Sequence, residues 1–234
     1  MSGHSKWATT HRQKAVVDAK RGAAFTKLGN MIAIAARGGT DPTTNSSLAL
    51  AIEKARAANM PNANIQRAID RINDKNAAAL EEAVYEGYGP GGVGIIIETA
   101  TDNKNRTYPE VRTALTKNGG TMADSGSVMF QFARKGVIRV AASGEEALLT
   151  VLDAGAEDAV EEDGGLTVYT DKKELAKVRE ALLAAGMTVE DAELQYVPNN
   201  TVAIEDDEIA RKLTKIIDAL EALDDVTNVA TNAA

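Results

Sequence analysis

The sequence predicts an α+β multidomain fold: an N-terminal all-α helical domain followed by two ferredoxin-like α+β domains, the second inserted in the first. Apolar residues recur at helical spacing up to about residue 79, and strands alternate with helices from residue 80. Residues 137–197 alone run strand-helix-strand-strand-helix-strand, the split βαβ order of a ferredoxin-like unit. A length of 234 residues with 44% apolar residues allows about one to three domains and is enough to bury a core.

Three helices are expected in the N-terminal part. Gly38-Gly39 stops the first, and Pro61 ends the second because proline cannot continue a helix. On the third, Arg67, Arg71 and Lys75 are four residues apart and share one face. The capping candidates of the second helix are Asn45, Ser46 and Ser47. The inward-facing residues are Phe25, Leu28, Ile32 and Ala35; Leu48, Ala51, Ile52 and Ala55; and Ile65, Ala68, Ile69 and Ile72.

The first α+β unit begins with a turn-rich stretch at 85–92, followed by a strand at 93–99. Thr107 and Glu110 have capping-box spacing, which predicts the start of a helix that a Gly-Gly pair at 119–120 ends. Alternating apolar residues then predict a strand; they are Val128, Phe130 and Phe132.

The second unit begins with a strand at 137–140. Ser143 and Glu146 form another capping box before a helix whose inward-facing residues are expected to be Leu148, Leu149 and Leu152. Two short strands flank Gly164-Gly165. A helix then runs from about Asp171 to Gly186, and an extended stretch continues to Tyr196.

Residues 93–132 lack the second helix and the last strand of a ferredoxin-like unit, and residues 205–230 supply both. The inward residues of that last helix are Ile209, Leu213, Ile216, Ile217, Leu220 and Leu223, and the strand is 226–229. We therefore expect three domains: a basic helical domain (1–79), an α+β domain (80–134 plus 205–234) and an inserted α+β domain (135–204). Two consecutive α+β domains are the alternative, but they leave the first sheet without its second helix.

Charge is distributed unevenly along the chain. The net charge is −8, yet residues 1–79 hold 12 basic and 5 acidic residues, whereas residues 80–234 hold 14 and 29. Binding to a polyanion depends on a local basic patch and not on the total charge. The basic end therefore predicts a polyanion site, with a solvated helix face as the alternative.

Several classes of chemistry are disfavoured by the residues. The chain has no cysteine, which excludes disulfides, thiolate metal sites and a cysteine nucleophile. His4 and His11 are a poor metal site with only Asp18 nearby, and no nucleophile or acid–base set converges. The glycines at 87–94 lack the Gly-Lys-Ser/Thr of a phosphate loop. We expect no enzyme activity, cofactor or metal, and, without a signal core or a membrane span, a cytoplasmic location.

The candidate nucleic-acid-binding residues lie in the first 37 positions, where cations stand beside an aromatic ring and two histidines. Trp7 is either a base-stacking residue or an apolar residue of the helical core. Asn103, Asn105 and Arg106 are either partner contacts or parts of a loop and helix start. Acidic clusters at 157–163 and 205–208 are interpreted as solvated charge, the latter also opening a helix. The candidates are His4, Lys6, Trp7, His11, Arg12, Lys14, Lys20, Arg21, Lys27 and Arg37.

The sequence also resembles the YebC/PmpR family. The matching stretches are His4–Trp7, Asp18–Gly22, Phe25–Leu28, Ala35–Gly39, Ala51–Pro61, Tyr85–Gly92, Glu98–Thr107 and Gly126–Phe130. The chain departs from the family after Trp7, where the family has a more basic, amide-rich stretch, and after the third helix, where Asn73-Asp74-Lys75 replaces the usual Lys-Gly. The resemblance implies an N-terminal helical domain plus two α+β domains. It also implies a transcriptional regulator, a mitochondrial translational activator or a ribosome-associated factor that helps synthesis of proline-rich stretches.

Residues and resemblance together predict a soluble, non-enzymatic, nucleic-acid-binding regulator of gene expression. The expected partner is ribosomal RNA on the ribosome or promoter DNA, with ribosomal proteins as further partners, no membrane, and a monomer as the favoured state. The alternative is an ACT-like small-molecule sensor, built from paired ferredoxin-like sheets, that does not contact nucleic acid directly.

Overall fold

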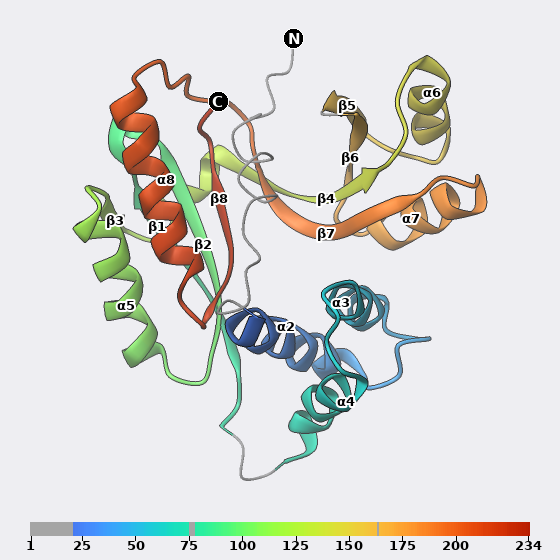
Figure 1. The fold of residues 1–234 in the computed structure, drawn as a ribbon, viewed down its shortest axis with the longest axis horizontal. Helices are drawn as coiled ribbons and strands as arrows, with labels where there is room; N and C mark the ends of the chain where they lie inside the picture. Colours follow the sequence, from blue (N-terminus) through green and yellow to red (C-terminus); the bar gives the residue numbers. More distant parts are fainter. Residues whose placement is uncertain (1–20, 75–77, 163) are drawn as a thin grey trace.

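The N-terminal part of the protein is helical. The structure, a computed structural model, describes residues 21–74, 78–162 and 164–234 (Figure 1). Its first elements are α2 (Arg21–Ala35), the short 3-10 helix η2 (Ala36–Gly38), α3 (Ser46–Ala57), α4 (Asn62–Asp70) and η3 (Arg71–Asn73). Asn45 is the cap of α3, because its side chain accepts the N–H of Leu48 at 3.1 Å. Ile32, Leu48 and Ala55 are fully buried at the centre of this unit, which confirms the predicted faces of the first two helices. On the third, Ile65 and Ile69 are buried as predicted, but Ile72 is 39% exposed because the α-helix ends at Asp70.

The first sheet has the antiparallel order β3-β1-β2-β8. Its strands are β1 (Glu81–Tyr88), β2 (Gly94–Thr101), β3 (Thr121–Ala123) and β8 (Val226–Thr231). The helices α5 (Lys104–Lys117) and α8 (Asp207–Glu221) cover one face (Figure 1). Ile95, Ile97, Leu115, Leu213 and Ile216 are fully buried between sheet and helices.

The second sheet has the antiparallel order β5-β6-β4-β7. Its strands are β4 (Phe132–Val140), β5 (Asp158–Glu162), β6 (Gly165–Asp171) and β7 (Val189–Pro198), and its helices are α6 (Glu145–Asp153) and α7 (Leu175–Ala184). The sequence of elements and the strand order are those of a ferredoxin-like unit. All four strands come between β3 and β8 in the chain, so the second sheet interrupts the first in sequence.

The α+β class, the helical N-terminal part and the two four-stranded antiparallel sheets are confirmed. The connectivity of the first sheet differs from the expected order, because β1 and β2 form a hairpin before α5. The domain boundaries at 134/135 and 204/205 stay a prediction.

Two local predictions in the first α+β unit are wrong. Residues 85–88 belong to strand β1 and only residues 90–92 form the turn η4 (Pro90–Gly92). Gly87 fits inside the strand because a Cβ there would lie 2.9 Å from the carbonyl oxygen of Thr121. Residues 128–131 form no strand either: η5 (Met129–Gln131) precedes β4, and Phe130 points to solvent.

Both predicted capping boxes are also wrong. Asn103 caps α5, whereas Thr107 lies inside that helix and is fully buried. Gly144, with φ 90°, stands at the start of α6, and no side chain caps this helix. The buried face of α6 also differs from the predicted one. Val151 is fully buried, whereas Leu149 is 57% exposed and Leu152 is 43% exposed.

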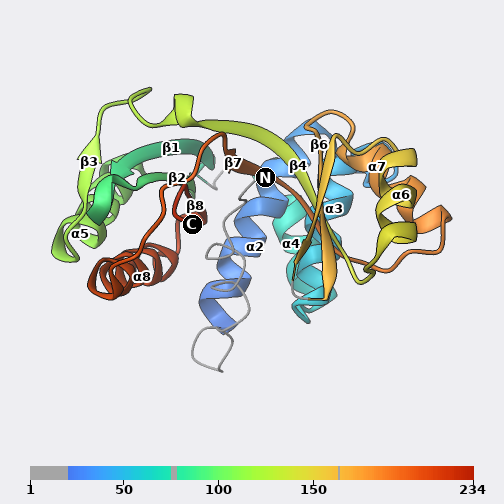
Figure 2. The same ribbon diagram turned by 90° about the horizontal axis from the view of Figure 1, so that it is seen from above.

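The helical domain lies between the two sheets (Figure 2). Helix α2 contacts β2 and β8 of the first sheet, and α3 contacts β7 of the second. A cleft of about 660 Å³ opens where these units meet. Met31, Ile34, Leu50, Leu175 and Leu194 line it, which makes much of its wall apolar.

Candidate nucleic-acid interface

Three of the ten predicted contact residues fall within the described chain. Arg21 is the first residue of α2, Lys27 lies in the same helix, and Arg37 lies in η2. The other seven lie outside the described residues; they are His4, Lys6, Trp7, His11, Arg12, Lys14 and Lys20.

The ammonium group of Lys27 makes a contact within the protein. Its Nζ donates a hydrogen bond to the carbonyl oxygen of Glu221, the last residue of α8. A cation at a helix C-terminus is stabilised by the helix dipole. Burial lowers the pKa of Lys27, and the charges of Glu221 and Asp224 oppose that shift. Lys27 therefore joins α2 to α8 in the free protein, and a phosphate contact would compete with this bond.

Arg37 is available to a ligand. Its side chain is exposed and makes no hydrogen bond or ion pair with the described residues. The pKa of Glu81 is lowered mainly by a hydrogen bond from Lys104. The positive charge of Arg37 lowers it further by a smaller amount. Arg37 therefore keeps all five of its N–H donors for a partner.

Two further cations of the helical domain face solvent. The side chain of Arg56, on α3, is exposed and has no hydrogen bond or ion pair to any described residue. Arg67, on α4, is exposed and is held within its own helix by the side chain of Asn64 and the carbonyl oxygen of Ala63. Sequence reasoning concentrated on the first 37 residues and missed Arg56. The sequence could have indicated Arg56, because it follows Ala55, which was expected to face the core, and a neighbouring residue on a helix points away from that face.

Other cations of this domain hold the neighbouring units. The Nζ of Lys54 pairs with Glu193 and lies 3.8 Å from the carboxylate of Asp191, both on β7. Arg179 of α7 pairs with Glu53 of α3. These ion pairs fix α3 to the inserted unit.

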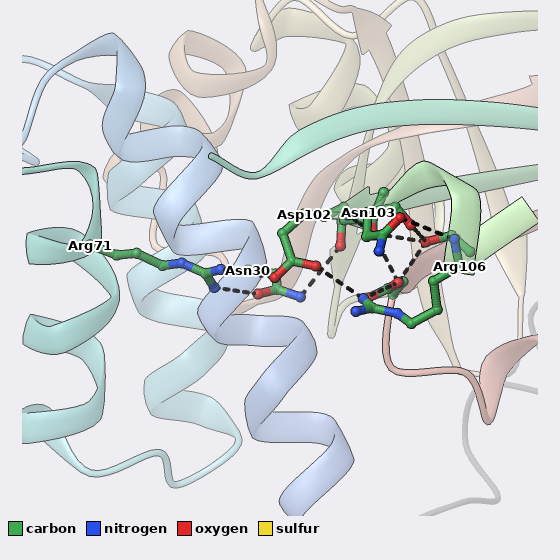
Figure 3. A network of polar contacts seen from close by, with 9 residues as sticks. Asn30, Arg71, Asp102, Asn103 and Arg106 are labelled. Carbon is green, nitrogen blue, oxygen red and sulfur yellow. Dashed lines mark hydrogen bonds and ion pairs between the residues drawn. The ribbon is translucent and has the colours of Figure 1, made fainter. Parts of the chain in front are cut away.

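A polar network fixes α2 and η3 to the first α+β unit (Figure 3). The buried Asn30 lies at its centre: its amide donates to the carbonyl oxygen of Ala100 at 3.4 Å and accepts from Arg71 at 3.3 Å. Arg71 also lies 3.8 Å from Asp102, which in turn pairs with Arg106 at 3.1 Å. Arg71 therefore stabilises the domain contact, whereas Arg67, four residues earlier on α4, is exposed.

The network ends at the buried carboxylate of Asp225. The hydroxyls of Thr107 and Thr101 lie 2.6 and 2.9 Å from its Oδ2, and the Nη2 of Arg106 lies 2.8 Å from it. Burial alone would raise the pKa of Asp225, but these donors outweigh burial and lower it. The carboxylate therefore stays ionised and holds the start of α5 against the start of β8.

The stretch 102–107 is thus a loop and helix start. Asn103 caps α5 by accepting the N–H of Arg106 at 3.2 Å, and the side chain of Arg106 pairs within the chain. Asn105 is exposed and makes no hydrogen bond to the described residues. Of the three residues named as possible partner contacts, Asn105 is the one left unengaged.

The acidic stretch 205–208 opens α8, as expected. Asp206 accepts the N–H groups of Glu208 and Ile209 at 2.7 and 3.3 Å.

In the described ranges 21–74, 78–162 and 164–234, no three His, Cys, Asp or Glu side chains are grouped so that they could hold a metal ion. Nor does any helix in those ranges have the length and apolarity to cross a membrane.

The cleft between the three units carries few free charges. Lys54 and Arg134 line it, but Glu193 and Glu98 pair with them. The guanidinium of Arg134 also stacks over the ring of Tyr196, 4.6 Å from its centre. The exposed cations at its rim are Lys172 and Lys173, whose side chains make no hydrogen bond or ion pair in the part of the chain that the structure describes.

Known proteins resemble this chain over its whole length. A family model described as "TACO1/YebC protein N-terminal domain" matches residues 5–75, and one described as "TACO1/YebC second and third domain" matches residues 80–233. A "Probable transcriptional regulatory protein" of Moorella thermoacetica is 51% identical over 240 residues, which cover 100% of this chain and 95% of the relative.

Two further comparisons agree with these matches. The "Probable transcriptional regulatory protein CT1665" of Chlorobaculum tepidum is 51% identical over 238 residues, covering 99% of this chain and 94% of the relative. The crystal structure of the conserved hypothetical protein Aq1575 from Aquifex aeolicus has 43% sequence identity and a TM-score of 0.89, and the match covers 95% of this chain and 93% of that one. With both domain models matched and about half of all residues shared with these relatives, the chain belongs to the TACO1/YebC family.

Proposed function

We propose that the protein is a nucleic-acid-binding regulator of gene expression whose basic N-terminal domain binds the phosphodiester backbone. The observation that carries this proposal is the charge division: 12 basic and 5 acidic residues in 1–79, against 14 and 29 in 80–234. Lysine and arginine side chains that neutralise phosphates release condensed counterions, which drives binding. The name of the relatives, probable transcriptional regulatory protein, supports a regulatory role.

The described contacts refine which cations would bind. Lys27, Lys54 and Arg71 hold domains together, whereas Arg37 and Arg56 are exposed and unpaired among the described residues. We therefore assign phosphate contacts to Arg37 and Arg56 together with the basic residues that precede α2 or begin it. In these roles Lys6, Arg12, Lys14, Lys20 and Arg21 bind phosphates, while Trp7, His4 and His11 stack on bases.

The proposed polymer is ribosomal RNA. Aromatic and histidine side chains interleaved with cations suit unpaired RNA bases better than a closed DNA duplex. The relatives' name favours promoter DNA as the other target. Cosedimentation with ribosomes in the presence of excess promoter DNA separates the two: persistence of the ribosome complex supports RNA, and its loss to DNA supports the promoter.

Charge neutralisation tests the proposal. A variant with Arg12, Lys14, Lys20 and Arg21 each changed to Gln should bind a labelled single-stranded RNA at least tenfold more weakly, as judged by fluorescence anisotropy. The matched control changes four cations of the α+β units, Arg112, Lys172, Lys173 and Lys215, to Gln, so the net charge changes equally. Circular dichroism checks that both variants are folded. If the folded variant of the four N-terminal cations binds the RNA as tightly as the wild-type protein, the proposal is contradicted.

The small-molecule alternative is favoured by one observation, the largely apolar cleft of about 660 Å³. A sensor whose ligand binds there would gain thermal stability with a metabolite. A metabolite screen by thermal shift, combined with an absence of RNA and DNA binding, would favour that function over the proposed one.

A further inference from the structure

The most exposed large apolar side chain in the described ranges lies on a loop of the first α+β unit. Phe130 is 73% exposed, far more than any other large hydrophobic residue described. It lies in η5, within the segment 124–131 that connects β3 to β4, here called the Phe130 loop. An isolated exposed apolar residue is common on a protein surface, but the loop that carries Phe130 is held by several hydrogen bonds.

A buried carboxylate holds the Phe130 loop from below. Glu86, 2% exposed in β1, accepts the backbone N–H groups of Gly126, Val128 and Met129 at 2.5, 2.6 and 2.7 Å. Burial alone would raise the pKa of Glu86, but these three donors lower it. Hydrogen bonds to an ionised group are roughly twice as strong as neutral ones. The backbone on the N-terminal side of Phe130 is therefore fixed.

The other side of the loop is fixed as well. Asn199, just after β7, donates its side-chain amide to the carbonyl oxygen of Phe130 at 3.2 Å and its backbone N–H to that of Gln131 at 2.8 Å. The amide of Asn232 donates to the side-chain oxygen of Gln131 at 2.8 Å. Gly94 lets the loop approach β2, because a Cβ there would lie 2.8 Å from Val128. The ring of Phe130 is thus presented on a framework with few alternative conformations.

The two chain segments that carry and hold Phe130 are polar and almost uncharged. Asp124 is the one charged residue in segments 121–131 and 198–202, which otherwise offer hydroxyl and amide groups. Ser125 and Asn200 are exposed and make no hydrogen bond to the described residues. A stable protein–protein interface buries about 800 Å² on each partner, which a lone aromatic ring cannot supply. An aromatic face flanked by free amide and hydroxyl groups matches the way unpaired bases are stacked and recognised at their edges.

We propose that Phe130 is a base-stacking site for a single-stranded nucleic acid whose phosphates are held by the basic N-terminal domain. This inference rests on the proposed function and extends it to the first α+β unit. The loop contacts β2 at Gly94, and α2 contacts the same strand at Ala100. At about 3.3 Å per residue, the two points are roughly 20 Å apart along the strand. The Phe130 loop and the helical domain therefore pack on the same strand, at a separation that a single-stranded nucleic acid can span.

The test compares substitutions at Phe130 in the full-length protein. Fluorescence anisotropy with a labelled, unstructured 20-nucleotide RNA, and with DNA of the same sequence, measures affinity from 50 to 200 mM salt. Phe130→Ala and Phe130→Leu should weaken binding roughly 5- to 150-fold, the factor for one lost stacked base, and Phe130→Trp should retain it. The loss should be the same factor at every salt concentration, since stacking releases no counterions. Leu149→Ala, at an exposed residue of the inserted unit, is the matched control.

Each outcome has a distinct meaning. Wild-type binding with the expected salt response, together with unchanged affinity of Phe130→Ala, overturns the stacking site and leaves the proposed function intact. An absence of wild-type binding to both polymers contradicts the proposed function itself. If Phe130→Leu binds as well as wild type while Phe130→Ala does not, an apolar contact replaces stacking and the inference is wrong. Thermal unfolding of Phe130→Ala should match wild type, because the ring is exposed.

Discussion

The helical domain and the α+β units differ in the number of acidic residues that accompany their free cations. In the α+β units, Arg106 and Lys104 pair with carboxylates of the first unit, and Arg134 on β4 pairs with Glu98 on β2. In the helical domain, Arg37 and Arg56 are exposed and unpaired within the described chain. The free cations of the α+β units stand among 29 acidic residues, whereas the helical domain has 5. The difference teaches that affinity for a polyanion follows the local excess of unpaired cations, which the net charge of −8 conceals.

The largest effect on stability should follow from breaking an ion pair of the α+β units. Asp225→Ala removes the acceptor of Thr101, Thr107 and Arg106, and should lower the free energy of unfolding by about 3 kcal/mol. Urea unfolding measures the loss. Glu180→Ala, an exposed acid on α7 without an ion pair to described residues, is the control and should change stability by less than about 0.5 kcal/mol. Equal stabilities of the two variants would show that the carboxylate network does not hold the fold.

Acid should weaken the α+β units through two carboxylates. The pKa values of Glu86 and Asp225 in the folded protein lie below their ordinary values of 4.5 and 3.8. The unfolded chain therefore takes up these protons at higher pH than the folded protein. Their stabilisation is complete above those ordinary values and is lost as pH falls through the folded-state values. Urea unfolding between pH 7 and pH 3 should show a smaller acid-induced loss for Glu86→Gln than for wild type; identical pH profiles would refute this assignment.

Lys27 should affect stability more than binding. Lys27→Gln weakens the contact of α2 with the carbonyl oxygen of Glu221 and should lower the free energy of unfolding by about 1 kcal/mol. Because the contact lies inside the molecule, the salt dependence of RNA binding should keep its wild-type slope. A shallower slope with unchanged stability would instead place Lys27 on a phosphate.

The smallest effect on stability should come from the exposed arginines. Arg37→Gln with Arg56→Gln should leave the free energy of unfolding within about 0.5 kcal/mol of wild type, since neither side chain is paired. The slope of log affinity against log salt should become less steep by about 1.4 for single-stranded RNA if both contact phosphates. An unchanged slope would restrict the binding surface to residues that precede α2.

Local patterns predicted most of the fold. The sequence correctly predicted the apolar face of α8, from Ile209 to Leu220, and the order of elements in residues 137–197. Both depend on periodicity and turn residues, which act within a few positions. Strand β1 was missed because Gly87 resembles a turn residue until Thr121 is placed beside it. The strand expected at Val128–Phe132 failed because a carboxylate more than 40 residues earlier shapes that loop.

The candidate site was less predictable than the fold. Its basic composition is visible in sequence, but the use of each cation depends on distant partners. Lys27 meets Glu221, 194 residues away, and Arg106 meets Asp225, 119 residues away. No short-range pattern separates such engaged cations from free ones such as Arg37 and Arg56.

The salt dependence of wild-type binding tests the central claim most directly. Anisotropy titrations with single-stranded RNA at 50 to 200 mM salt give the number of phosphates neutralised. If about six cations of the N-terminal domain contact phosphates, affinity should fall several-hundred-fold to about a thousandfold over this range. A flat response, or no binding at 50 mM salt to RNA, DNA or ribosomes, would contradict the claim that the basic domain binds a phosphodiester backbone.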